Sequence, residues 1–179
     1  GGVRQDRIAR RYASFGDGAL MAFPPGDIFG EEHIAIGPGC LIAAQVSLSV
    51  GMAPGQPLPP GVHSPVLTLG ARTSLGRGSH VVAHRSIVIG ADVMTGPSCY
   101  ITDQNHVYAD PDVPIGQQWP AEDPVEIGPG SWLGAGAIVQ VVYEIWRLFA
   151  RRSAGGLASP LNTAGLLAGM AIMYATGLL

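Results

Sequence analysis

Residues 67–90, LTLGARTSLGRGSHVVAHRSIVIG, decide the fold of this chain. Aliphatic side chains recur in this stretch at intervals of six residues, at Leu69, Leu75, Val81 and Ile87. An amphipathic helix repeats its apolar positions about every 3.6 residues and a half-buried strand about every two, so neither explains this step. A short strand followed by a tight turn explains it, because the aliphatic side chain points inward while a glycine such as Gly70 permits the turn.

The same step runs through most of the chain from four segments with the pattern aliphatic-x-aliphatic-Gly, at residues 34–37, 67–70, 87–90 and 125–128. Continued from these segments, it passes through Ile36, Ile42, Leu48, Leu69, Leu75, Val81, Ile87, Ile89, Thr95, Ile101, Ile127, Leu133 and Val139. The fourth residue after most of these positions is small, as at Cys40 and Cys99, and Arg85 is the exception. The pattern predicts repeated short strands over roughly residues 14–139, with both cysteines as packed thiols.

Composition excludes several classes of protein. Glycine (26) and proline (15) fill 41 of 179 positions, and each costs an interior helix about 1 or 3 kcal/mol, which excludes a helix bundle. A net charge of −3 leaves no large basic patch, so no nucleic-acid partner is expected. All ten basic residues are arginine, which excludes mechanisms that use a lysine. Two cysteines without CxxC spacing and the lack of a signal-peptide pattern favour a cytoplasmic location.

The repeat resembles that of the hexapeptide-repeat acyltransferase family, whose chains form a left-handed parallel β-helix. The resemblance covers roughly residues 14–139 and implies triangular coils of about eighteen residues, each made of three hexapeptides. It implies an all-β domain over residues 1–139, with protruding loops. It also implies a homotrimer with active sites in the grooves between subunits.

Two intervals between the repeat segments are too long for one coil. From Ile36 the matching anchors follow after 33, 20 and 38 residues, which leaves a surplus in the first and last intervals. The surplus predicts loops at residues 51–65, which are rich in proline, and at residues 103–124. Long excursions from a rigid scaffold are common places for function.

The second loop and the segment after it carry the functional motif. The loop opens with ITDQNH (101–106) and leads into PVEIGPGSWLGAGA (124–137). This arrangement resembles the sugar O-acetyltransferase-like subgroup of the family. The resemblance implies that His106 is the catalytic histidine, and that acetyl-CoA is the co-substrate, a sugar or related small molecule the acceptor, and no metal is needed. It also implies that the active site or the coenzyme A tunnel is lined by Trp132, Gly134 and Ala135.

Acetyl transfer to a hydroxyl fits the residue types in this motif. The hydroxyl loses its proton as it attacks the thioester, and an ordinary histidine, with a pKa of about 6.5, is suited to take that proton. Backbone N–H groups of glycine-rich turns can stabilise the oxyanion. Asp103 is a candidate to orient the imidazole, and it is grouped with three further candidates for substrate binding: Asn105, Trp132 and His84. Tyr108, Asp112 and Trp119 either line the acceptor pocket or hold the loop down.

Two alternatives compete with this interpretation. A zinc site like that of the β-helical carbonic anhydrases would require His80, His84 and His106, but the spacing of the first two does not match that family. A non-catalytic or truncated scaffold protein is the second alternative, because the family adds one or two further coils after the position of Val139. A metal assay and an acetyl-CoA binding assay separate these possibilities.

Residues 140–179 depart from the repeat. They predict an apolar helical tail that is atypical of the family, with a break at residues 153–160 and no charge after Arg152. Residues 161–179 just reach the length of a membrane span. Their glycines and alanines favour packing on the end of the β-helix, so membrane contact is the less favoured alternative.

Overall fold

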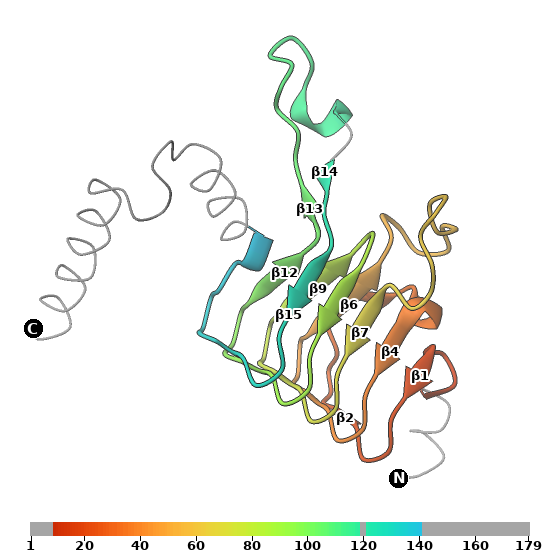
Figure 1. Cartoon of the computed structure of the whole chain (residues 1–179), viewed down its shortest axis with the longest axis vertical. Coiled ribbons are helices and arrows are strands. Elements are labelled where there is room, and N and C mark those ends of the chain that lie inside the picture. Colours follow the sequence, from red (N-terminus) through yellow and green to blue (C-terminus); the bar gives the residue numbers. More distant parts are fainter. Residues whose placement is uncertain (1–8, 119–120, 141–179) are drawn as a thin grey trace, which may run out of the picture. The chain divides into compact units, whose positions relative to one another are not determined.

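The computed structural model describes residues 9–118 and 121–140 and consists largely of short strands and turns (Figure 1). The strands are β1 (Ser14–Phe15), β2 (Leu20–Met21), β3 (Ile28–Phe29), β4 (Ile34–Ile36), β5 (Leu41–Ile42), β6 (Ser47–Val50), β7 (Leu67–Leu69), β8 (Ser74–Leu75), β9 (His80–Ala83), β10 (Ile87–Ile89), β11 (Met94–Thr95), β12 (Tyr100–Thr102), β13 (Gln104–Asn105), β14 (Ala121–Glu122), β15 (Val125–Ile127) and β16 (Trp132–Leu133). Two short 3-10 helices are η1 (Glu31–His33) and η2 (Ile115–Gln117).

Most of the strands form three parallel sheets, which the chain visits in turn. The orders are β1-β4-β7-β10-β15 in the first sheet, β2-β5-β8-β11-β16 in the second and β3-β6-β9-β12 in the third. Each round of the three sheets makes one coil, and successive coils pair strand on strand (Figure 1). The described part is therefore all-β with stacked parallel strands, as predicted, and this arrangement is compatible with a β-helix. The left-handed sense of the coil stays a prediction.

The six-residue positions form the core of this coil stack. The aliphatic residues of the series from Ile36 to Ile127 are buried, and Leu133 and Val139 of the last coil pack partly buried against them. Burying one such side chain contributes about 1.5–3 kcal/mol, so the repeat supplies the main stabilisation of the stack. Cys40 and Cys99 are buried free thiols, and burial raises the pKa of the Cys40 thiol.

The glycine that follows each aliphatic pair lies where one coil meets the next. A Cβ atom added to Gly90 would lie 2.6 Å from the backbone nitrogen of Pro129 in the following coil. Contacts this short do not occur between real atoms of these kinds, so a side chain at this corner would push the coils apart. Stacking therefore explains why glycine recurs at one phase of the repeat.

Two long segments interrupt the coils. β6 ends at Val50 and β7 begins at Leu67, so the first predicted loop lies between them. The second predicted loop, residues 103–124, contains more regular structure than expected, because β13 pairs with β14 as an antiparallel hairpin that also carries η2. This hairpin protrudes from the coil stack (Figure 1).

The contacts divide the chain after Gln140. From residue 141 the predicted helical tail, including the segment 161–179 considered for membrane contact, lies outside the described residues. Among the helices of the described residues, none is long and apolar enough to cross a membrane.

Candidate active site

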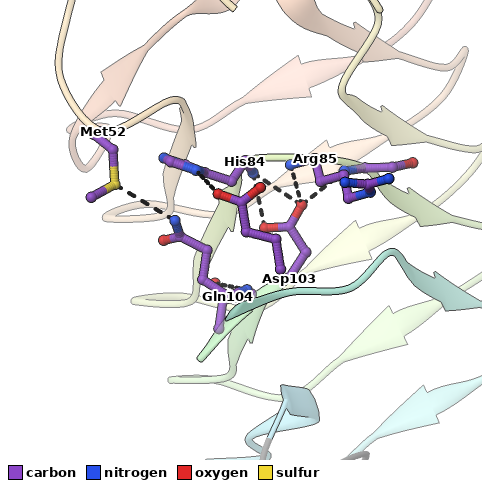
Figure 2. A network of polar contacts seen from close by, with 8 residues as sticks. Met52, His84, Arg85, Asp103 and Gln104 are labelled. Carbon is purple, nitrogen blue, oxygen red and sulfur yellow. Dashed lines mark hydrogen bonds and ion pairs between the residues drawn. The ribbon is translucent and has the colours of Figure 1, made fainter. Parts of the chain in front are cut away.

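Asp103 joins the third sheet to the hairpin and lies fully buried between β12 and β13. Its carboxylate accepts hydrogen bonds from the successive backbone N–H groups of His84, Arg85 and Ser86, with N···O distances of 2.7–3.0 Å (Figure 2). Successive N–H groups of this kind form a concave site for an anion, which offsets the cost of burying the carboxylate. Asp103 thereby fixes the turn between β9 and β10.

The roles predicted for Asp103 in substrate binding and in orienting His106 stay predictions. Both carboxylate oxygens are engaged with the backbone of the turn, and the side chain has no exposed surface. The geometry favours a structural role for this residue.

His84 lies in the same turn and is also buried. Its Nδ1 atom lies 2.7 Å from Oε1 of Glu122 on β14, so the ring contacts the second leg of the hairpin. A carboxylate only accepts hydrogen bonds, so Nδ1 carries the proton. The other ring nitrogen, Nε2, is buried and makes no hydrogen bond within the described part of the chain. The substrate-binding role predicted for His84 is therefore untested, and this conformation keeps the ring away from solvent.

His106 follows β13 by one residue and is exposed. Asn105, just before it, pairs with Ala121 across the hairpin and is half-buried. Within the described residues no hydrogen bond or ion pair engages the His106 ring. An exposed imidazole on a protruding hairpin can reach a proton on a bound molecule, which is the first requirement for a general base.

Trp132, Gly134 and Ala135 lie on the last coil. Trp132 begins β16 in the second sheet, pairs with Met94 of β11 and is 71% exposed. A Cβ atom added to Gly134 meets no described atom within 4 Å, so the backbone at this corner is open to close approach by a ligand. The residues predicted to line the site thus belong to the second sheet, whereas His106 belongs to the hairpin that leaves the third sheet.

The distal part of the hairpin encloses an open hollow of about 440 Å³. It is lined by Tyr108, Asp110, Pro111, Asp112, Val113, Pro114, Ile115 and Gln118. The Gln118 side chain donates hydrogen bonds to the carbonyl oxygens of Asp110 and Val113, at 2.9 and 2.8 Å, and so holds this part together. The volume lies within the range of small-molecule sites. Trp119, the third residue considered for this loop, lies outside the described residues.

The zinc alternative finds no cluster in the described part of the chain. No group of three or more His, Cys, Asp or Glu side chains there is placed to hold a metal ion. Of the three histidines considered, His84 has its Nδ1 atom on Glu122, and His80 lies on β9 with its ring 6.4 Å from that of Tyr100.

Glu122 is the site residue that sequence reasoning missed. It looks like an ordinary surface acid near the end of a long loop, and its contact with His84 spans 38 residues of sequence. The available signal is its position next to Asp123 and Pro124, where the chain returns to the repeat.

Comparison with known proteins gives one informative relative. No protein-family model and no solved structure matches this chain. A Mycobacterium tuberculosis protein named "Probable acetyltransferase Rv3034c" is 36% identical to it over 72 residues. Those residues are 40% of this chain and 24% of the relative, so the chain spans about a quarter of that protein's length.

Proposed function

We propose that this protein is an acetyltransferase that moves an acetyl group from acetyl-CoA to a hydroxyl of a sugar or related small acceptor. The observation that carries the proposal is His106, exposed on a hairpin whose root is fixed to a rigid coil stack. The similarity to a protein named as an acetyltransferase supports the reaction class. The sugar acceptor follows from the motif resemblance around residues 101–106 and 124–137.

In the proposed mechanism His106 removes the proton of the acceptor hydroxyl as its oxygen attacks the thioester carbonyl carbon. Backbone N–H groups at glycine-rich corners stabilise the oxyanion. The new C–O bond forms, the C–S bond breaks, and the protonated His106 returns the proton to the leaving thiolate. Gly134 and Ala135 are the residues assigned to coenzyme A, and the open backbone at Gly134 fits a ligand that packs closely against it.

The proposed assembly is a homotrimer of left-handed β-helices with sites between subunits. One observation supports a partner on the second sheet. Large apolar side chains there occupy outward positions in register with one another and are each at least 48% exposed: Leu20, Leu41, Met94 and Trp132. Exposed apolar patches of this kind are typical of surfaces that associate with another protein.

The test replaces His106 with alanine and follows release of free thiol from acetyl-CoA with a panel of sugar acceptors. Loss of a general base lowers kcat by about 100- to 10,000-fold, so a loss of that size is expected for His106→Ala. His63→Ala is the matched control, because His63 is an exposed histidine on the other long loop. Wild-type turnover by His106→Ala would refute the assignment.

Calorimetric titration with acetyl-CoA separates the enzyme from the scaffold alternative. An enzyme of the proposed class binds acetyl-CoA in the absence of acceptor. A chain that shows no heat of binding and no thiol release would be a non-catalytic scaffold.

A further inference from the structure

Both legs of the hairpin are anchored to one residue of the coil stack. On the first leg, the carboxylate of Asp103 accepts hydrogen bonds from the backbone N–H of His84 at 2.9 and 3.0 Å. On the second leg, the carboxylate of Glu122 accepts one from the ring of the same histidine at 2.7 Å. The backbone N–H of Asp123 donates to the carbonyl oxygen of Asp103 at 3.0 Å and closes the root between the legs. Figure 2 shows Asp103 and His84 at the centre of this network.

Beyond the root, the hairpin has few constraints. β13 and β14 pair through Gln104 with Glu122 and through Asn105 with Ala121. His106 follows directly after the last paired residue of β13. The direction in which His106 points therefore depends on the tilt of this short ladder, and the tilt depends on how the two legs are held at the root.

The two anchors do different work. Asp103 satisfies the turn between β9 and β10 through three backbone N–H groups, so the turn does not need Glu122. The contact between Glu122 and His84 instead ties β14 to the stack. Their side chains are only 14% and 3% exposed, so both lose most of their hydration to make this contact. Buried polar pairs are not an efficient source of stability, but they can select one arrangement over others.

We propose that His84 and Glu122 are positioning residues for His106. Their ring-to-carboxylate hydrogen bond sets the tilt of the hairpin and thereby the place of the imidazole relative to the bound acceptor. This inference rests on the proposed role of His106. A displacement of about 1 Å at a reacting group can lower a rate about 100-fold, so a pair outside the chemistry can control turnover.

The test is Glu122→Ala, with Glu122→Gln as the conservative variant and Glu126→Gln as the control on the exposed face of β15. Glu122→Ala is expected to lower kcat tenfold or more with little change in the KM for acetyl-CoA. Glu122→Gln keeps an oxygen that can accept from Nδ1, so it is expected to recover most of that loss. A role in stability alone would change the melting temperature and leave kcat of the folded protein unchanged.

Hydrogen exchange of the full chain gives a readout that does not depend on activity. Glu122→Ala is expected to speed exchange of the amides at residues 106–118, while the strands of the coil stack keep their protection. Wild-type kcat and wild-type exchange in this variant would overturn the proposal. If Glu122→Ala does not fold, Glu122→Gln and Glu122→Asp decide by the same exchange measurement, and unchanged exchange in both overturns it.

The outcomes also separate this inference from the proposed function. Full activity in His106→Ala refutes the role of His106, and the exchange experiment still reports whether Glu122 holds the hairpin. An inactive His106→Ala together with a fully active, folded Glu122→Ala supports the enzyme and refutes the positioning pair.

Discussion

The coil stack and the hairpin that leaves it are specified in different ways. In the stack each coil repeats the same side-chain positions, so Leu75 and Val81 reach full burial through a rule that is local in sequence. The hairpin has no repeat, and its hydrogen bonds with the stack within the described residues lie at its root, between residues distant in sequence such as His84 and Glu122. A periodic pattern can build a rigid scaffold, whereas the direction of a functional side chain on it depends on a few particular contacts.

The largest expected effect is at Asp103, where the two regions join. Asp103→Ala leaves three backbone N–H groups of the β9–β10 turn without their acceptor. Each buried donor left unsatisfied costs about 1–3 kcal/mol, so the free energy of unfolding should fall by at least about 3 kcal/mol in denaturant titrations. Asp103→Asn keeps one acceptor oxygen and should fall in between. A loss no larger than that of the exposed Asp92→Ala would contradict this account.

A pair of glycine substitutions compares an inner coil with the last one. In Gly90→Ala the new methyl group meets the backbone of Pro129 at 2.6 Å, whereas in Gly128→Ala the nearest described atom is Oγ of Ser131 at 4.0 Å. Overpacking costs about 1–3 kcal/mol, so Gly90→Ala should destabilise by that amount. Gly128→Ala, at the same phase of the repeat, should change stability by less than about 0.5 kcal/mol. Thermal unfolding of both variants measures the difference, and equal effects would show that stacking does not select glycine here.

The smallest expected effect is on the outer surface of the stack. Arg72 and Asp92 form a paired contact at 2.6 and 2.7 Å on adjacent coils, and the guanidinium lowers the pKa of the Asp92 carboxyl from its ordinary 3.8. The stabilisation is therefore present above pH 3.8 and is lost as the pH falls through the lowered pKa. Exposed pairs contribute little and are screened by salt, so Arg72→Ala should differ slightly from wild type at neutral pH and low salt.

The control for this prediction is acid and salt. Denaturant titrations of wild type and Arg72→Ala should converge at a pH below the lowered pKa of Asp92, or in concentrated salt. A difference that grows on acidification would show that the pair is not its source.

The sequence allowed prediction of the stack in detail, including its inward residues. One exception, Thr95, is inward as well, and its hydroxyl accepts the backbone N–H of Gly76 at 2.9 Å, which is why a polar residue is tolerated there. The other, Arg85, is exposed and belongs to the turn held by Asp103. A departure from the repeat therefore marked the root of the hairpin before the structure was known.

The hairpin itself was not predictable in the same way. Residues 103–124 carry loop-forming residues, and the pairing of Gln104 with Glu122 leaves no periodic signal. His106 was found through its motif, and its exposure suits the role proposed for it. The burial of His84 and its partner Glu122 depend on tertiary contacts that no local pattern encodes.

The closed root of the hairpin also has an evolutionary consequence. Because Asp103 and Asp123 meet through a backbone hydrogen bond, the strands on either side of the excursion keep their register whatever lies between them. Insertions, deletions and exchanges between Asn105 and Ala121 can therefore accumulate without disturbing the coils. The same scaffold could acquire new acceptor preferences by exchanging one segment of chain, and grafting a foreign tip onto this root is a practical route to engineered variants.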